Sequence, residues 1–234
     1  MNLNEFIIEL KKINIDVTEE QLNQLNEYYI LLVEWNQKIN LTRIIDKEEV
    51  YLKHFYDSAT LNKAINLNEI DNLCDFGTGA GFPGIVIKIL FPNIRITLVD
   101  SLNKRVNFLN EVINKLNLKD IVAIHTRVED FAKNNREIFD VVVARAVAKL
   151  NILIEYATPL VKCEKYFIAM KANIDEELEE AKSAIEKLHL SLENKLEFKL
   201  PKEESIRNII VFQKKKRTEL KYPRSTNEIK KRLL

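Results

Sequence analysis

Four glycines lie within ten residues, from Asp75 to Gly84, and the chain has no other glycine. Glycine adopts positive φ angles without steric cost and lets a ligand approach the bare backbone. A short apolar run precedes this stretch, and Pro83 stands before the apolar segment 85–91, at a position where a helix accepts proline. A strand, a glycine turn and a helix N-terminus in this order predict a site for a nucleotide or a nucleoside.

Spacing alone leaves two kinds of ligand open. The last three glycines match the G-x-G-x-x-G pattern of dinucleotide-binding proteins, and Asp100 follows about 20 residues on, where an acid binds a ribose. Against a dinucleotide, the pattern begins late after the strand, and Pro83 would lie inside the phosphate contact. Asp75 would repel a pyrophosphate but would attract a ligand that carries a positive charge and no phosphate.

S-adenosylmethionine is such a ligand, because it carries an ammonium and a sulfonium group. Its ribose offers hydroxyls to an acid, and its adenine needs a polar partner. Carboxylates follow three successive predicted strands, at Asp75, at Asp100 and in the segment 128–130. Ligands bind at the carboxyl ends of the strands in an open α/β sheet, so these positions predict one site. For Asp100 alone, capping of the next helix is the competing interpretation.

The elements around these residues alternate between apolar strands and amphipathic helices, which is typical of a parallel α/β sheet with crossover helices. Strands are predicted at 70–75, 94–99, 121–126, 139–144 and 166–171. Helices are predicted at 85–91, 102–116, 150–161 and 175–189. Two late strands, 196–200 and 207–213, follow each other closely and predict an antiparallel hairpin at the sheet edge.

Three predicted helices precede the sheet and form an N-terminal helical cap over residues 1–66. They are expected at 3–13, from Thr18 onward, and at 47–63. Thr18 and Gln21 have capping-box spacing, and apolar residues then recur at helical intervals. We expect the α/β domain over residues 67–214 and a basic C-terminal tail over residues 215–234.

Composition narrows the class of protein. The chain is 46% hydrophobic and 30% charged, which is typical of a soluble globular protein, and no apolar run approaches the ~20 residues that span a bilayer. Residues 1–12 lack the order of a signal peptide, so we expect a cytoplasmic protein without a membrane partner. Cys74 and Cys163 are too few for a disulfide framework or a zinc site, and no metal is expected.

The net charge of +1 hides an uneven distribution. Acids outnumber bases in residues 1–40, whereas bases outnumber acids in residues 214–232. A phosphate backbone would be attracted to the second segment, and a solvated tail without a partner is the equally weighted alternative. The hairpin that closes the sheet edge suggests a monomer.

Several segments are similar to one known family. They are D-F-G-T-G-A-G-F-P-G at 75–84, L-V-D-S-L-N-K-R-V-N-F-L at 98–109, R-V-E at 127–129, A-R-A-V at 144–147, W-N-Q-K-I-N-L-T at 35–42, H-F-Y-D-S at 54–58 and Y-P-R at 222–224. With this ordered set the chain resembles the bacterial 16S rRNA methyltransferase G family (RsmG), also called glucose-inhibited division protein B. The resemblance covers nearly the whole chain.

The resemblance implies a class I S-adenosylmethionine-dependent methyltransferase, Rossmann-like, with strand order 3-2-1-4-5-7-6. It implies methyl transfer from S-adenosylmethionine to N7 of one guanine in the 530 loop of 16S rRNA, on the free rRNA or the 30S subunit. The family's cofactor positions fall on Gly77, Phe82, Val128, Glu129 and Arg145, and Asp100 joins them through the ribose argument. The positions implied for RNA are Asn40, His54, Arg127, Arg145, Lys171 and Arg207.

The implied chemistry asks little of side chains, because guanine N7 has an in-plane lone pair and no proton. No general base is required, and alignment of N7 with the methyl group and sulfur supplies most of the rate. We therefore expect His54 and Arg145 to act by positioning. The competing interpretations are ion pairing with nearby acids for Arg127 and Arg145, and hydrogen bonding near Asp57 for His54.

Two departures from the family pattern and two further functions stay open. Phe82 replaces a usual leucine, and Ala172 replaces a usual glycine after Lys171. The alternative functions are a methyltransferase for another RNA or a small molecule, and an RNA-binding module that keeps only a nucleoside pocket.

Overall fold

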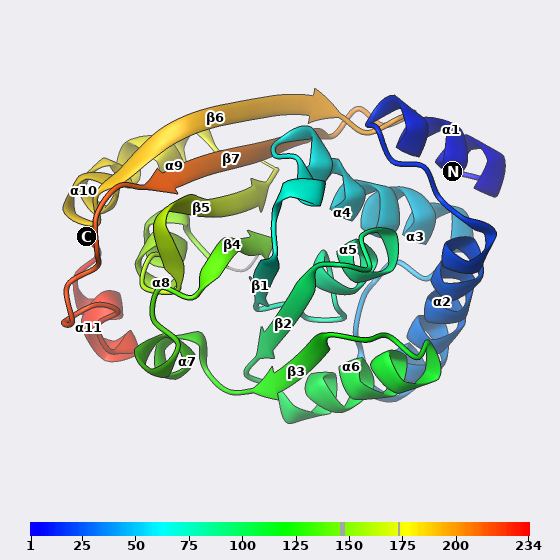
Figure 1. The fold of residues 1–234 in the computed structure, drawn as a ribbon, viewed down its shortest axis with the longest axis horizontal. Coiled ribbons are helices and arrows are strands. Elements are labelled where there is room, and N and C mark those ends of the chain that lie inside the picture. Colours follow the sequence, from blue (N-terminus) through cyan, green and yellow to red (C-terminus); the bar gives the residue numbers. More distant parts are fainter. Residues whose placement is uncertain (146–147, 173) are drawn as a thin grey trace.

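The computed structural model describes residues 1–145, 148–172 and 174–234, and its centre is a seven-stranded sheet with the order β3-β2-β1-β4-β5-β7-β6 (Figure 1). The strands are β1 (Asn72–Phe76), β2 (Arg95–Asp100), β3 (Ile121–His125), β4 (Phe139–Arg145), β5 (Val161–Lys171), β6 (Leu190–Lys199) and β7 (Ile206–Lys214). The first five run parallel, and β7 is antiparallel to both β5 and β6. The predicted strand order and the edge hairpin are confirmed.

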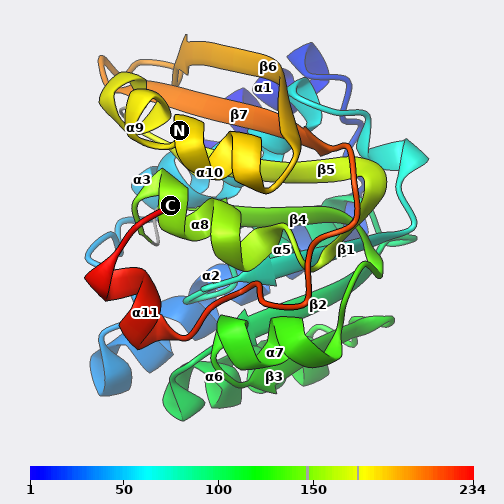
Figure 2. The same ribbon diagram turned by 90° about the vertical axis from the view of Figure 1, so that its left-hand side faces the viewer.

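Helices cover both faces of this sheet (Figure 2). The α-helices are α1 (Leu3–Lys12), α2 (Glu19–Ile39), α3 (Lys47–Val50), α4 (Asp57–Ala59), α5 (Gly84–Leu90), α6 (Asn103–Lys115), α7 (Val128–Asn134), α8 (Leu150–Ala157), α9 (Asp175–Glu180), α10 (Lys182–Lys187) and α11 (Thr226–Lys231). A π-helical turn, η1 (Tyr51–Tyr56), and two 3₁₀ turns, η2 (Thr60–Lys63) and η3 (Leu67–Glu69), complete the set. Capping boxes begin α1, α2 and α11.

The central strands are buried on both faces, which explains their continuous apolar sequence. Along β4, Val141 and Val143 pack into one apolar cluster, and Val142 and Ala144 pack into a second. The first cluster includes residues of α1, α2, α5 and α6, and the second includes residues of α7, α8 and α10. Successive side chains of a strand point to opposite faces of the sheet, so the N-terminal helices, with α5 and α6, pack on one face and the later helices pack on the other.

Element boundaries differ from the sequence prediction where charge masks the pattern. β5 begins at Val161 and β6 at Leu190, several residues earlier than predicted. The first halves of these strands carry lysine and glutamate, which break the apolar alternation on which the prediction depended. The helix expected at 175–189 is two short helices, and α8 ends at Ala157. The segment 47–63 is helical throughout but contains the π-helical turn η1.

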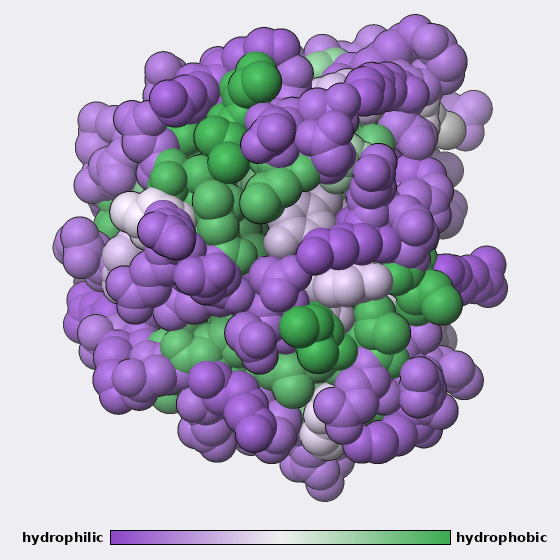
Figure 3. All heavy atoms as spheres, turned by 90° about the vertical axis from the view of Figure 1, so that its right-hand side faces the viewer, coloured by the Kyte–Doolittle hydropathy of each residue, from purple (hydrophilic) through white to green (hydrophobic). Residues whose placement is uncertain are grey.

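The N-terminal helices form the face in Figure 3, where apolar residues are exposed in patches between polar ones. Ile8 of α1 and Ile30 of α2 are among the exposed apolar side chains. None of the helices in the described part of the chain is both long enough and apolar enough to cross a membrane.

Candidate functional site: two joined cavities

Two cavities meet at the carboxyl ends of the strands. The first cavity, of about 650 Å³, is lined by the glycine turn and by residues that follow or end β2, β4 and β5. The second cavity, of about 350 Å³, is lined by residues of the turn after β3 and of α8. Both are lined by Gly77, Asp100 and Ser101, so one elongated ligand can extend from one into the other.

The glycine turn that separates β1 from α5 is shaped by backbone conformation and by close approach. Gly79 has a φ of +62°, and a Cβ there would meet nothing within 4 Å, so conformation alone requires glycine. At Gly84 the reason is space, because a Cβ would lie 2.3 Å from Leu98 Cδ2. The Gly77 amide donates to the Val99 carbonyl at 2.8 Å, which ties the start of the turn to β2.

Asp75 closes this turn from behind. Its Oδ2 accepts hydrogen bonds from Thr78 Oγ1 at 2.6 Å and from the Gly84 amide at 2.8 Å. The residue is fully buried and lines neither cavity, and burial raises its pKa to about 7. The sequence interpretation placed Asp75 against a positively charged ligand, whereas the structure uses the carboxyl group to hold the turn.

Asp100 lies at the junction of the two cavities and is only 3% exposed. Its Oδ2 accepts from the Gly79 amide at 3.0 Å and lies 3.4 Å from Arg105 Nη1. Its Oδ1 accepts from the Leu102 amide at 2.9 Å, just before α6 begins. Asp100 does not cap α6, whose N-cap residue is Leu102 without a side-chain cap. Its carboxylate instead holds the two loops together and lines the ligand space, as the ribose interpretation requires.

Tyr28 supports the glycine turn from behind, outside the lining of both cavities, and the sequence did not reveal this role. It comes from α2, is fully buried, and its hydroxyl donates to the Ala80 carbonyl inside the glycine turn. Its ring centroid lies 5.4 Å from that of Phe55 and 5.5 Å from that of Phe82. In the sequence it is one apolar position of an amphipathic helix, and nothing local indicates its partner.

One wall of the first cavity is built around the imidazole of His54, which lies in the π-helical turn η1. Its ring stacks on Phe82 with centroids 4.5 Å apart. Nε2 lies 2.9 Å from Thr42 Oγ1, and Nδ1 lies 3.3 Å from Arg145 Nη2. Because a guanidinium can only donate, Nδ1 is the acceptor, and the ring proton lies on Nε2. Burial, and then the Arg145 charge, lower the pKa of His54 to about 3, so the ring is neutral.

Asp57 joins two cations in the same wall. Its Oδ2 lies 2.9 Å from Arg145 Nη1 at the end of β4, and its Oδ1 lies 3.2 Å from Arg207 Nε on β7. The carboxylate is 6% exposed, so water screens these pairs little. The structure thus brings together three predicted residues: Asp57, which the sequence did not single out as a site residue, joins Arg145 to Arg207, and Arg145 contacts His54.

The remaining predicted RNA residues are not gathered at one place. Lys171 lines the first cavity, and its Nζ lies 2.5 Å from Glu177 Oε2. Asn40 is the exposed, left-handed cap of α2 and lies outside the lining of both cavities, next to Leu41, which lines the first. Arg127 lies in the lining of the second cavity, with its side chain 67% exposed.

The predicted cofactor residues are distributed along the joined cavities. Gly77 lines both, Phe82 and Arg145 line the first, and Val128 and Glu129 line the second. The last two residues of the 144–147 segment lie outside the described residues. Among the residues that the structure describes, no group of three or more histidine, cysteine or acidic side chains is arranged to hold a metal ion.

Comparison with known proteins gives a consistent result. The family described as rRNA small subunit methyltransferase G matches residues 21–209. A relative named ribosomal RNA small subunit methyltransferase G from Bacillus subtilis (strain 168) is 50% identical over 227 residues, which cover 96% of this chain and 95% of the relative. Its counterpart from Exiguobacterium sibiricum is 48% identical with the same coverage.

Solved structures share the fold at lower identity. A precorrin-6y C5,15-methyltransferase from Geobacter metallireducens has a TM-score of 0.55 and 18% identity, over 74% of this chain and 91% of that one. TYW2 of M. jannaschii in complex with AdoMet has a TM-score of 0.56 and 15% identity, over 74% of this chain and 79% of that one. The sheet and its helices therefore have the class I methyltransferase fold that the sequence predicted.

Proposed function

This chain belongs to the rRNA small subunit methyltransferase G family, and we propose that it methylates N7 of one guanine in the 530 loop of 16S rRNA. Its general activity is the S-adenosylmethionine-dependent methylation of small-subunit ribosomal RNA. The atom, the nucleotide and the roles of single residues are the proposed part. We also propose that it works as a monomer in the cytoplasm, where ribosomes are assembled.

The residues of the joined cavities fit S-adenosylmethionine. The second cavity offers apolar side chains, among them Leu102 and Leu153, that suit a flat adenine ring. Asp100, at the junction, can accept hydrogen bonds from two ribose hydroxyls because a carboxylate has several lone pairs. The glycine turn then lines the route into the first cavity with bare backbone, where the methionine end would lie.

The residues of the first cavity position the reactants. S-adenosylmethionine, when bound, supplies a methyl group on a positively charged sulfur. Guanine N7 carries no proton, so the neutral His54, with its pKa lowered to about 3, is not needed as a base and can act through packing and hydrogen bonding. Arg145 and Arg207 are donors suited to guanine O6 and to phosphate oxygens. Asp57 fixes the direction of both guanidinium groups.

One observation favours an RNA substrate over a small molecule, and an enzyme over an RNA-binding module without activity. The cations that Asp57 holds lie in the lining of the same cavity as the glycine turn, so donors for a nucleic acid adjoin the expected position of the methyl group. A small apolar substrate would not need this pair of cations. An RNA-binding module without activity would not need the nucleoside-sized second cavity beside them.

The test is to incubate the protein with radiolabelled S-adenosylmethionine and 30S subunits that lack the modification. Borohydride and aniline then cleave the rRNA at N7-methylguanine and locate the label. We expect one cleavage site, within the 530 loop, and no label on subunits that already carry the modification. Label at another atom of the rRNA would overturn the proposed N7 target and leave rRNA methylation intact. Label on another RNA would overturn the proposed substrate and leave RNA methylation intact.

A further inference from the structure

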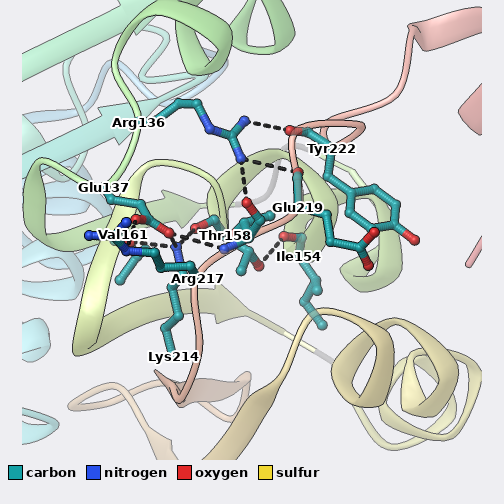
Figure 4. A network of polar contacts seen from close by, with 10 residues as sticks. Arg136, Glu137, Ile154, Thr158, Val161, Lys214, Arg217, Glu219 and Tyr222 are labelled. Carbon is teal, nitrogen blue, oxygen red and sulfur yellow. Dashed lines mark hydrogen bonds and ion pairs between the residues drawn. The ribbon is translucent and has the colours of Figure 1, made fainter.

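The chain after β7 runs past α8 to α11, which lies toward α7, and the last residues then turn back toward α8 and α10 (Figure 2). We call residues 215–231 the C-terminal strap. The sequence predicted only a basic tail here, but the structure holds it at three points. At the first, the Arg136 guanidinium donates to the carbonyls of Tyr222 at 2.6 Å, Thr218 at 2.8 Å and Glu219 at 3.1 Å (Figure 4).

The second point is a buried lysine at the end of β7, directly before the strap. Lys214 is 0% exposed, and its Nζ donates to Glu137 Oε1 at 2.7 Å and to the carbonyls of Val161 at 2.8 Å and Thr158 at 3.0 Å (Figure 4). The same oxygen of Glu137 accepts from the Thr218 amide at 3.0 Å. Arg136 and Glu137 are neighbours, so one short segment before β4 fixes both the start and the middle of the strap.

The third point fixes the strap where α11 begins. Glu155 of α8 is 1% exposed, and its Oε1 accepts from the Arg224 backbone amide at 2.9 Å and from Arg224 Nε at 2.8 Å. Its Oε2 accepts from Arg224 Nη2 at 2.6 Å. Ser225 then caps α11, so the direction of the first helical residue, Thr226, is set by its two predecessors.

These three anchors place Thr226 in the lining of the second cavity, where its hydroxyl donates to Glu129 Oε1. We propose that Thr226 is a positioning residue of the cofactor site: it orients the Glu129 carboxylate toward the adenosine end of S-adenosylmethionine. The C-terminal strap is then a wall of the cofactor site, supplied from the far end of the chain. The inference rests on the cofactor and does not depend on which guanine is methylated.

The charge around Glu129 explains why a positioning donor is needed. Glu129 is 8% exposed, and the guanidinium of Arg127 lies 3.8 Å from the same Oε1. Both the Thr226 hydroxyl and this guanidinium contact Oε1, but the Arg127 side chain is 67% exposed, so the hydroxyl is the better ordered partner of the carboxylate. Tyr156, which also lines the cavity, lies close to Thr226, and burial raises the pKa of its phenol, so it stays a neutral donor. The threonine is therefore the partner that we expect to fix the orientation of Glu129.

The test uses three full-length variants. Thr226→Val keeps the shape and loses the hydroxyl, Thr226→Ser keeps the hydroxyl, and Asn227→Ala changes an exposed neighbour on the same helix. Calorimetry measures binding of S-adenosylmethionine and of 5′-methylthioadenosine, which has the adenosine but lacks the amino-acid end. We expect Thr226→Val to weaken both by about tenfold, the size of one hydrogen bond to a charged group, and the other two variants to bind within about twofold of the wild type.

Kinetics separate positioning from a general structural role. Thr226→Val should raise the KM for S-adenosylmethionine and leave kcat at saturating cofactor unchanged, because the methyl group would lie in the first cavity. Unchanged affinity for 5′-methylthioadenosine would overturn the proposal, and so would an equal loss in Asn227→Ala or no rescue by serine. Because the binding assay contains no RNA, its failure leaves the proposed guanine target untouched, and failure at the guanine target leaves this result untouched.

Discussion

The two cavities are adjacent but are built by different means. The wall of the first is a set of paired charges from distant parts of the chain, with Asp57 between Arg145 and Arg207. The second is lined by apolar side chains, by Asp100 at the end of β2, by Arg127 and Glu129 after β3, and by Thr226 of α11. Charges in the first cavity suit an anionic substrate, and the shape of the second suits an uncharged nucleoside. Substitutions should therefore separate methyl transfer from adenosine binding.

The largest effect is expected from Asp57→Ala. Two guanidinium groups, whose side chains are 15% and 22% exposed, would lose their shared carboxylate. Removing one partner of a largely buried ion pair costs about 3 kcal/mol in the free energy of unfolding, and urea unfolding measures it. Asp57→Asn keeps the shape of the side chain and one acceptor oxygen, so its free energy of unfolding should fall by less. Affinity for 5′-methylthioadenosine should change by less than about threefold in both, about 0.6 kcal/mol.

A different outcome for Asp57 would break the comparison. If Asp57→Ala weakens 5′-methylthioadenosine as strongly as Thr226→Val does, the two cavities respond as one site. The glycine turn would then transmit the change, because Phe82, which stacks on His54, belongs to that turn.

An intermediate effect is expected from Arg207→Ala. Loss of one charged donor to RNA should lower turnover on the ribosomal substrate by about tenfold, or about 1.4 kcal/mol, while affinity for S-adenosylmethionine stays within about threefold. Arg127→Ala is the matched variant, because it removes the same kind of side chain from the second cavity. Steady-state kinetics on 30S subunits, with each reactant varied in turn, measure both.

The matched arginine also decides a question that the sequence left open. The family pattern implies RNA contact for Arg127, but the structure places it in the lining of the second cavity, 3.8 Å from Glu129. A raised KM for S-adenosylmethionine in Arg127→Ala would assign it to the cofactor end. A loss that appears only with the ribosomal substrate would return it to the RNA and would extend the RNA surface past the second cavity.

What the sequence could predict depended on how local the signal was. The glycine turn and Asp100 follow from neighbouring residues, the alternation of strands and helices follows from periodicity, and the strand order follows from the resemblance to the family; the structure has all of them. The partners of Tyr28, Asp57 and Thr226 lie 52, 88 and 97 positions away along the chain. A single sequence holds no signal for such pairs. The basic composition of the strap also hid its anchors, since a lysine that is buried and one that is solvated look alike in the sequence.

The smallest expected effect is on the pH dependence of stability, and it tests whether water reaches His54 in the first cavity. The folded-state pKa of His54 is lowered to about 3, below the value of about 6.5 for an unfolded chain. Between those values the unfolded chain binds a proton and the folded protein does not, so stability falls as pH drops below about 6.5 and is fully present above it. From pH 7 to pH 5.5 the free energy of unfolding of the wild type should fall by about 1 kcal/mol more than that of His54→Gln. Urea unfolding at the two pH values measures both.

The same imidazole gives an independent readout in the folded state. Its NMR signal should not titrate between pH 5 and pH 8, and the rate of methyl transfer should show no inflection that His54→Gln removes. A titration near pH 6.5 would mean that water reaches the ring and that Arg145 does not lie against it. Arg145 would then be held less firmly than its 2.9 Å contact with Asp57 implies. The difference between the first cavity, with its paired charges, and the second would be weaker at the contact that defines it best.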